Sequence, residues 1–402
     1  MARLLPSMLS VVLSIGWAAA VPTSRSPNAG TFTIDTTRNP NYAPNGPREY
    51  ARALAKWQIE IPETLAKFGV NRHSGDVAAT PFADDREYLS TVGIGTPPQN
   101  ITVDLDTGSS DFWVYSSETA QTDLGNRVRW EPAKSSTAEK IPNSTWWIQY
   151  GDSSYAYGNV WRDTVTIADI SVPGAVVESA MDVSFQLSTD EDLCGIFGLA
   201  IGLNSRVIPS QPTVINSMKP LLDAQVFTSD LKWHAEGTYS FGGIDSSQFT
   251  GDIRYVPLHE NAKYWEINVT GVHIGDASVW YLFNWSSIVD TGTSLLLMDD
   301  DVVKAYYNAA PAAYYKAKYD AWVYPCDTVL PDLELGFSHD NTVKIPGRYI
   351  NYTALEGTVC MGGLQSNIDQ GFSVLGDIFL KAVFAVFDYD GRRVGFANKV
   401  LN

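Results

Sequence analysis

The sequence is short of basic side chains. It has 28 Lys and Arg against 45 Asp and Glu, which gives a formal net charge of -17. A groove for nucleic acid needs clustered Lys and Arg, and an anionic membrane surface attracts the same residues. We therefore expect neither nucleic acid nor a membrane as a partner. Histidines are also few, at five, and we expect no metal site and no cofactor.

The few basic residues are unevenly distributed. Residues 21–74 carry a net charge of +3, whereas residues 75–402 carry -21. This asymmetry predicts that a small basic segment docks on a strongly acidic body. The alternative is a basic linker that faces solvent, because charge runs are usually solvated. If the segment docks over a functional cleft, Lys56 is the first candidate for a lysine within it, and Lys67 is also available.

Long apolar runs are scarce as well. One such run, residues 9–17, follows Arg3 and precedes the small residues Ala18, Ala19 and Ala20. It is shorter than the roughly 20 apolar residues of a membrane-spanning helix. The pattern is typical of a secretory signal peptide cleaved after Ala20, so we predict a secreted, extracellular protein.

Cysteine is nearly absent, with three in the chain. Cys326 and Cys360 lie in the same half of the chain and are the expected disulfide pair. Cys194 remains single in an apolar setting, which favours a buried, inert thiol over a nucleophile. Glycosylation sequons of the Asn-x-Ser/Thr type begin at five positions: Asn100, Asn143, Asn268, Asn284 and Asn351.

The body of the chain is predicted to be mostly β. Residues 48–68 have the apolar spacing of a helix, interrupted by Pro62. Short β-type runs follow, separated by clusters of Gly, Pro, Asn and Asp. Examples are residues 88–94, 101–105, 159–167 and 264–274, and short helices are expected near 213–222 and 299–308.

An internal repeat divides this body into two. Asp106-Thr-Gly-Ser-Ser is echoed later in the chain by Asp290-Thr-Gly-Thr-Ser. Two apolar residues and a Gly follow each copy at a similar spacing, and these units end at Gly198 and Gly376. A duplicated lobe explains this pattern. We therefore predict a signal peptide at 1–20, a propeptide at 21–74, an N-terminal lobe at 75–250 and a C-terminal lobe at 251–402.

The repeated motif points to acid–base chemistry. Each apolar strand ends in an Asp, so Asp106 and Asp290 are expected to meet on the floor of a cleft between the lobes. Two adjacent carboxyl groups cannot both ionise easily and share a proton over a wide pH range. Such a pair can hold a water, take its proton and donate to a peptide carbonyl.

The residues after each Asp suit this arrangement. Each glycine lets backbone N–H groups approach the carboxylates, each middle threonine can hydrogen-bond across the lobe interface, and the next hydroxyl faces the outer carboxylate oxygen. These supporting residues are Thr107, Gly108 and Ser109 in the first loop, and Thr291, Gly292 and Thr293 in the second.

With both motifs in place, the sequence resembles the pepsin family, in particular secreted fungal acid proteases of the penicillopepsin and aspergillopepsin type. The resemblance covers about residues 84–398, including Tyr88-Leu-x-x-Val-x-Ile-Gly-Thr-Pro-Pro-Gln99 and Ser373-Val-Leu-Gly-Asp-Ile-Phe-Leu380. It implies an all-β, bilobal fold of two similar barrel-like lobes. It also implies an endopeptidase that acts on proteins and peptides, binds its own propeptide and is a monomer.

The resemblance further implies an active-site flap at residues 148–152. Tyr150 would close over the substrate and Trp113 would hydrogen-bond the Tyr150 hydroxyl. Bulky apolar residues are then preferred on both sides of the cut bond, and fungal relatives that accept Lys before the cut carry an Asp at position 152. The residues assigned to the flap and the first subsite are Tyr150, Gly151, Asp152, Ser154, Trp113, Phe112 and Ile196.

The sequence departs from the family pattern at two positions, and several other functional classes are weighed against the resemblance. Ser153 replaces the usual second flap glycine, and Cys194 replaces an Asp before the first apolar-apolar-Gly unit, which leaves the specificity open. The sequence has no Gly-x-Ser-x-Gly motif, so the nucleophile elbow of a serine hydrolase is absent. His259-Glu260 is not followed by the second His that the zinc-protease motif requires. A two-carboxylate glycosidase is chemically possible. The rival from another class is a non-catalytic binding or inhibitor protein on the same scaffold.

Overall fold

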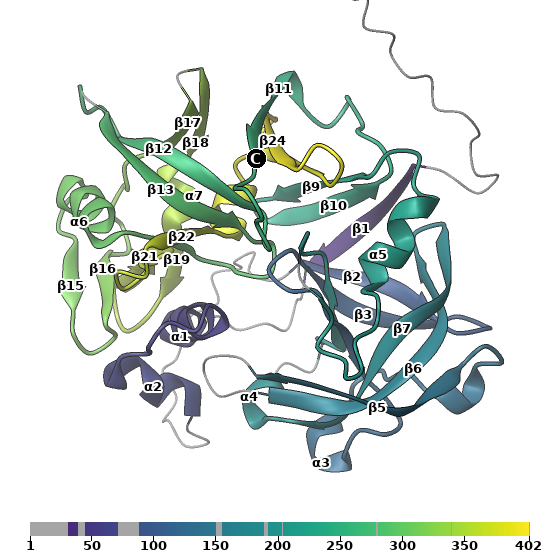
Figure 1. Cartoon of the computed structure of the whole chain (residues 1–402). Helices are drawn as coiled ribbons and strands as arrows, with labels where there is room; N and C mark the ends of the chain where they lie inside the picture. Colours follow the sequence, from purple (N-terminus) through teal and green to yellow (C-terminus); the bar gives the residue numbers. More distant parts are fainter. Residues whose placement is uncertain are drawn as a thin grey trace, which may run out of the picture.

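The computed structural model describes residues 31–38, 45–70, 88–149, 155–188, 192–202, 204–278, 280–338 and 340–401. Within these ranges the chain consists mainly of β-strands with a few short helices. Figure 1 shows the strands of residues 88–183 (β2 to β7), in blue and teal, on one side and those of residues 266–375 (β12 to β22), mostly in green, on the other, with the strands of residues 226–257 (β9, β10 and β11) and 393–398 (β24) together between them. The architecture is all-β and bilobal, as predicted.

The largest sheet has 13 strands and contains segments from both halves. Its order from edge to edge is β11 (Thr250–Pro257), β24 (Arg393–Asn398), β23 (Phe384–Asp388), β9 (Val226–Lys232), β10 (Ala235–Phe241), β1 (Phe32–Arg38), β2 (Tyr88–Ile94), β3 (Gln99–Asp106), β8 (Gly195–Gly198), β4 (Phe112–Tyr115), β7 (Ile170–Val183), β6 (Tyr155–Ile167) and β5 (Glu139–Gln149).

The second half contributes two further sheets. The seven-stranded one runs β18 (Asn341–Ile345), β17 (Leu333–Ser338), β12 (Glu266–Ile274), β13 (Tyr281–Val289), β22 (Phe372–Leu375), β14 (Leu296–Met298) and β21 (Leu364–Ser366). The four-stranded one runs β15 (Tyr314–Lys316), β16 (Ala321–Pro325), β20 (Val359–Gly362) and β19 (Asn351–Ala354).

The helices are short. They are α1 (Gly46–Lys56), α2 (Glu63–Val70), α3 (Gln121–Leu124), α4 (Phe185–Ser188), α5 (Val214–Met218), α6 (Asp300–Ala309), α7 (Gly347–Ile350) and α8 (Asp377–Leu380). α5 continues into a 3₁₀ turn at Lys219–Leu221. The two helices expected near 213–222 and 299–308 are therefore present.

The helix predicted over residues 48–68 is wrong in its middle. α1 starts after Asn45, whose side chain accepts a hydrogen bond from the Arg48 N–H, and ends at Lys56. Gln58 then has φ +57°, which a helix does not allow, and α2 begins only after Pro62. The break leaves Lys56 at the end of α1, so its side chain is free to extend beyond the helix.

The internal repeat is visible in the strand pairing. β3 runs parallel to β8 and places Asp106 opposite Gly198, while β13 runs parallel to β22 and ends one residue before Asp290. β4 then pairs antiparallel with β8, and β14 pairs antiparallel with β22. The same strand arrangement thus presents an aspartate in each half. The boundary near residue 250 stays a prediction.

Residues 32–38 are built into the centre of the molecule. As β1 they pair antiparallel with β10 on one side and with β2 on the other. Thr36 is fully buried, and its hydroxyl oxygen accepts a hydrogen bond from the Gly237 N–H at 2.8 Å. The basic segment that precedes the acidic body is therefore held by strand pairing as well as by helices α1 and α2.

One disulfide joins Cys326 and Cys360, the pair expected from the sequence. It closes a separation of 34 residues, for which the loop-entropy estimate is about 3–4 kcal/mol of stabilisation. Cys194 is free and buried, and its thiol lies 3.6 Å from the Asp192 carbonyl oxygen. Burial raises the pKa of Cys194 to about 11, which suits the inert thiol predicted for this position.

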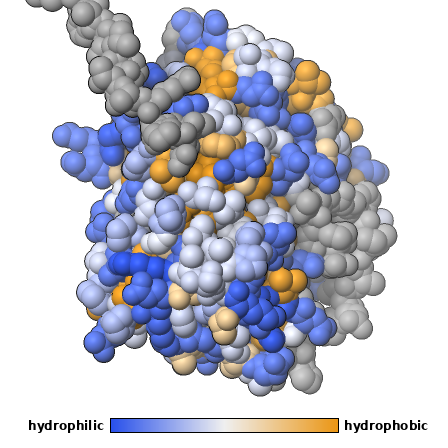
Figure 2. Space-filling view, turned by 90° about the vertical axis from the view of Figure 1, so that its right-hand side faces the viewer, coloured by the Kyte–Doolittle hydropathy of each residue, from blue (hydrophilic) through white to orange (hydrophobic). Residues whose placement is uncertain are grey.

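The apolar side chains lie mainly inside the molecule. On the face shown in Figure 2, hydrophilic side chains predominate and hydrophobic ones form separate areas. Trp147, Leu282 and Val329 are among the large apolar side chains that remain exposed. In the described parts of the chain, no helix is both long and apolar enough to cross a membrane.

Candidate active site

Asp106 and Asp290 are buried and are held by matching sets of donors. The Gly108 N–H donates to Asp106 Oδ1 at 2.7 Å and the Ser109 hydroxyl to Oδ2 at 2.6 Å. On the other side, the Gly292 N–H donates to Asp290 Oδ1 at 3.1 Å, and the Thr293 hydroxyl donates to Oδ2. Both carboxylates therefore have fixed orientations before any ligand binds.

The two glycines bring each loop close to the opposite aspartate. A Cβ atom on Gly108 would lie 2.6 Å from Asp290 Oδ1, and one on Gly292 would clash with Asp106 Oδ1. Any side chain at either position would therefore force the carboxylates apart. Glycine is required here for close approach, as the sequence pattern indicated.

Thr107 and Thr291 lock the two loops together. The Thr107 N–H donates to Thr291 Oγ1 at 3.1 Å, and the Thr291 N–H donates to Thr107 Oγ1 at 2.9 Å. Each hydroxyl then donates to a carbonyl of the opposite half: Thr107 to Val289 at 2.9 Å, and Thr291 to Leu105 at 2.5 Å. These four bonds fix the relative positions of the two aspartates across the interface.

The Lys56 ammonium lies between the two carboxylates. Its Nζ is 2.8 Å from Asp106 Oδ1, 2.8 Å from Asp290 Oδ2 and 3.0 Å from Asp290 Oδ1. Of the two lysines considered from the sequence, Lys56 makes this contact, whereas Lys67 is exposed on α2. The basic segment thus places a cation at the centre of the acidic pair.

This ion triad shifts the pKa of each member. Burial disfavours the Lys56 ammonium, but the charges of Asp106 and Asp290 outweigh it and raise the pKa of Lys56 above its ordinary value. Burial would also raise the pKa of Asp106, but Lys56 and the donors Ser109 and Gly108 lower it. For Asp290 burial prevails, aided by the Asp106 charge, and the pKa rises. The two carboxyl groups are therefore unequal while Lys56 is present.

A cavity of about 400 Å³ opens beside the pair. Its wall includes Lys56, Gln58, Gly108, Ser109, Ser110, Asp111, Ile148, Gln149, Asn204, Ser205, Arg206, Lys263 and Tyr264. The Trp57 ring packs edge-on against Tyr264 at 5.0 Å and against Phe372 at 5.8 Å. The residue after Lys56 therefore contacts Tyr264, which lines the cavity, with a large aromatic side chain.

The other predicted site residues are divided between the core and the undescribed part of the chain. Phe112 packs on Phe197 at 4.8 Å, and Trp113 is fully buried against Trp146 at 6.0 Å. Ile196 lies in the same apolar cluster as Trp113. Neither Phe112 nor Ile196 lines the cavity. The flap residues Tyr150, Gly151, Asp152 and Ser154 lie outside the described residues.

Several cavity residues were missed by the sequence analysis. Tyr264 was assigned to a strand, although it lies just before β12 and faces Trp57. Asn204, Ser205 and Arg206 carry no motif of their own. Asp111, by contrast, directly follows the first Asp-Thr-Gly-Ser-Ser, and an acidic residue entering a buried strand was a usable signal.

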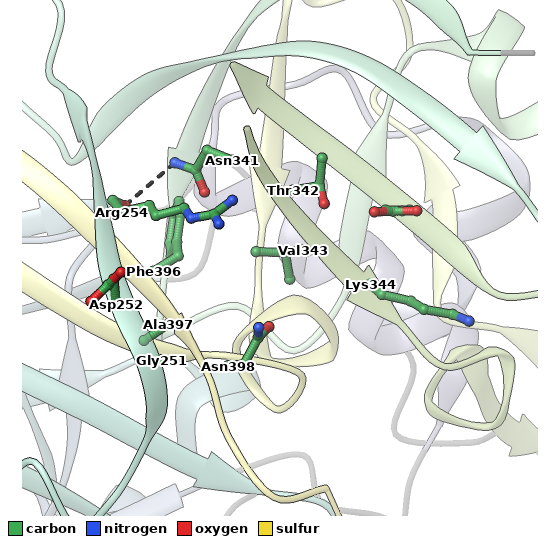
Figure 3. A pocket seen from close by; sticks show the side chains of 11 residues that line it. Gly251, Asp252, Arg254, Asn341, Thr342, Val343, Lys344, Phe396, Ala397 and Asn398 are labelled. Carbon is green, nitrogen blue, oxygen red and sulfur yellow. Dashed lines mark hydrogen bonds between the residues drawn. The ribbon is translucent and has the colours of Figure 1, made fainter. Parts of the chain in front are cut away.

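A second cavity, of about 430 Å³, lies between the edge strands β11 and β18 (Figure 3). Arg254, Asn341 and Lys344 are among the residues around it, and the Asn341 side chain donates to the Arg254 carbonyl at 3.4 Å. It shares no wall residue with the first cavity. Among the described residues, no cluster of His, Cys, Asp and Glu is arranged to hold a metal ion.

Comparison with known proteins agrees with this geometry. The family model described as "Eukaryotic aspartyl protease" matches residues 87–399. Aspergillopepsin-1 of Aspergillus flavus is 39% identical over 94% of this chain and 95% of its own. Endothiapepsin of Cryphonectria parasitica is 37% identical over 94% and 93%, and penicillopepsin-1 of Talaromyces stipitatus is 36% identical over 96% and 98%.

Proposed function

The chain belongs to the eukaryotic aspartyl protease family and is thus an aspartic endopeptidase, and we propose that it is a secreted zymogen that hydrolyses peptide bonds at acid pH through a water held between Asp106 and Asp290. The observation that carries this proposal is the Lys56 ammonium, which contacts both carboxylates. A position that satisfies two carboxylates with one donor group also suits a water molecule. Lys56 therefore occupies the place where the attacking water binds once the segment leaves.

The proposed mechanism uses the pair as acid and base. Without Lys56, the two carboxyl groups share one proton, because ionising two neighbouring carboxyl groups is unfavourable. The ionised member removes a proton from the water as it attacks the peptide carbonyl, while the protonated member donates to the carbonyl oxygen. Ser109 and Thr293 hold the outer carboxylate oxygens, which keeps the inner ones turned toward the water.

Acid is proposed to release the inhibitory segment, residues 21 to about 74. The docked state lowers the pKa of Asp106, so this carboxylate stabilises docking above its ordinary pKa. That contribution is lost as the pH falls toward the lowered value. Protonation of other carboxylates on the acidic body weakens the attraction of the +3 segment in the same direction.

An acid-shift experiment tests this proposal. Purified precursor is expected to be inactive on denatured haemoglobin at neutral pH. After transfer to about pH 4 it is expected to lose the inhibitory segment and become active. Mass spectrometry before and after the shift gives the first mature residue. Full activity at neutral pH without shortening would rule out the zymogen.

The proposed substrates are proteins and peptides with bulky apolar residues on both sides of the cut bond. The main support is the aromatic ring of Tyr264 in the cavity wall, which already packs against the Trp57 ring of the segment. Burying such a side chain contributes roughly 1.5–3 kcal/mol. The enzyme is proposed to act outside the cell as a monomer, without a cofactor.

Glycan attachment is proposed at the accessible sequons. The side chains of Asn100, Asn143, Asn284 and Asn351 are exposed. Asn268 is only half-exposed, and its Oδ1 lies 2.7 Å from His259 Nε2. We therefore rank Asn268 lowest of the five sites.

A secondary cleavage after Lys is expected if Asp152 recognises the positive charge of a substrate side chain. A flap carboxylate at the rim of the first subsite can pair with a substrate ammonium, where a charge-assisted bond contributes about 1.5–3 kcal/mol. Replacing Asp152 by Thr should then reduce the rate after Lys at least about tenfold more than the rate after Phe. The paired Lys and Phe peptides control for general damage. Equal losses would mean that Asp152 serves only the hairpin turn.

The rival from the sequence analysis, a non-catalytic binding or inhibitor protein on this scaffold, is disfavoured by the site. Both aspartates are present with their full sets of donors, whereas such a protein has no need of them. Hydrolysis of denatured haemoglobin after the acid shift separates the two candidates directly.

A further inference from the structure

A second pair of carboxyl groups lies behind the cleft wall. Asp111 follows the first aspartate loop, and Glu178 belongs to β7, which runs parallel to β4 with Trp113 opposite Glu178. Each of these two acidic residues is 2% exposed. The two carboxyl groups lie close enough to interact directly, although neither takes part in the mechanism proposed above.

The contacts of this pair favour a shared proton. Asp111 Oδ1 accepts from the Arg206 N–H at 2.5 Å, and Glu178 Oε1 accepts from the Ser205 hydroxyl at 3.4 Å. Glu178 Oε2 is buried and has no donor among the described residues. Two ionised carboxylates only accept hydrogen bonds, so these neighbouring groups can bond to each other only when one of them carries a proton. A single shared proton would supply that bond and relieve the repulsion.

Few charges compensate the pair. The Arg206 side chain is the cation that faces Asp111, and it acts against the burial that raises the pKa of Asp111. Burial and the Asp111 charge raise the pKa of Glu178, which the Ser205 hydroxyl only partly opposes. No cation among the described residues contributes at Glu178. The site therefore favours the protonated form well above the ordinary pKa of a carboxyl group.

The pair connects the first aspartate loop to residues 204–206. Arg206 and Ser205 bind Asp111 and Glu178 respectively, and the Ser110 hydroxyl donates to the Asn204 carbonyl at 3.0 Å. Residues 204–206 and residues 108–111 line the same cavity. Full ionisation of the pair would place two negative charges together behind this wall and remove the bond between them.

We propose that Asp111 and Glu178 form a second proton-sharing pair, which positions residues 204–206 at the cleft only while it keeps its proton. These are positioning residues, and through them the folded cleft becomes less stable as the solution approaches neutral pH. Stability falls as the pH rises above about 4, because the folded state holds a proton that the unfolded chain releases near that pH. The proposal deepens the proposed function by naming what sets its upper pH limit.

Thermal unfolding of the full chain tests this proposal. An Asp290→Asn background prevents self-cleavage, and Asp111→Asn replaces the shared proton by an amide that can donate to Glu178. The Tm of the parent should fall between pH 4 and pH 7. The fall should be about 5 °C smaller for Asp111→Asn. Glu178→Gln should have the same effect, because it removes the other member of the pair.

Asp163→Asn is the matched control. Asp163 is also buried, but its Oδ1 accepts from Ser135 at 3.0 Å, from Thr137 at 2.6 Å and from the Thr164 N–H at 2.8 Å. Replacing Asp163 by Asn should lower Tm at pH 4 and at pH 7 by a similar amount.

Two results would overturn the proposal. One is an equal drop in Tm at pH 4 and pH 7 for Asp111→Asn and Glu178→Gln, as in the control. The other is failure of both amide variants to fold at pH 4, where the shared proton should make them tolerable. Because unfolding needs no peptidase activity, these results are independent of whether the proposed function is correct.

Discussion

Replacing Asp106 or Asp290 by Asn is expected to abolish peptidase activity while leaving the protein folded. The amide keeps the shape of the carboxyl group and can still bond to the loop N–H groups and hydroxyls. It cannot remove a proton from water, and positioned acid–base groups typically contribute 10²- to 10⁴-fold to the rate. We expect a loss of at least about 10³-fold in kcat/KM for each variant, measured on a peptide at acid pH.

Asp245→Asn is the matched control for this experiment. Asp245 is an exposed aspartate in a turn, bonded only locally to Ser247. It should leave kcat/KM unchanged. Circular dichroism of all three variants should match the parent. A folded Asp106→Asn or Asp290→Asn variant with more than a few per cent of parent activity would show that these residues are not the catalytic pair.

Replacing Lys56 by Met is expected to release the inhibitory segment at higher pH. Met fills a similar volume but removes the ammonium that both carboxylates contact. Breaking a buried ion pair by removing one partner typically costs about 3–5 kcal/mol, because the remaining charges are left uncompensated. Docking should weaken by about this amount, so the pH midpoint of self-shortening should move toward neutral and shortening at a fixed pH should be faster.

Lys67→Met supplies the control, since Lys67 is an exposed lysine of the same segment. It removes one positive charge from the +3 segment without touching the aspartates, so its effect on the midpoint should be small. Similar shifts for both variants would mean that overall charge, and not the contact of Lys56 with the pair, keeps the cleft closed.

The paired aspartate loops could be predicted because their signal is local and occurs twice. Asp106 ends β3, Asp290 directly follows β13, and a glycine stands two residues after each, so the geometry of both strand ends follows from the pattern. The threonine cross-links could be anticipated for the same reason. The disulfide was predictable because Cys326 and Cys360 are the only cysteines of the second half.

The long-range contacts could not be predicted in the same way. Composition indicated a basic segment on an acidic body, but it left Lys56 and Lys67 as alternatives. Which of the two lysines reaches the aspartates depends on where α1 ends. A helix predicted through residue 68 does not show that Lys56 stands at a helix end. Asp111 and Glu178 are far apart in the sequence and meet only because β4 and β7 are parallel neighbours, which no local pattern encodes.

Active-site titration with a statine-type peptide inhibitor tests the central claim most directly. The hydroxyl of such an inhibitor replaces the water between the two carboxyl groups, so it binds far more tightly than a substrate. Calorimetry on the acid-activated enzyme should show one inhibitor per chain, with no tight binding to the Asp290→Asn variant or to the precursor at neutral pH, where Lys56 occupies the pair. Tight binding to the intact neutral precursor, or equal binding to Asp290→Asn, would contradict the account.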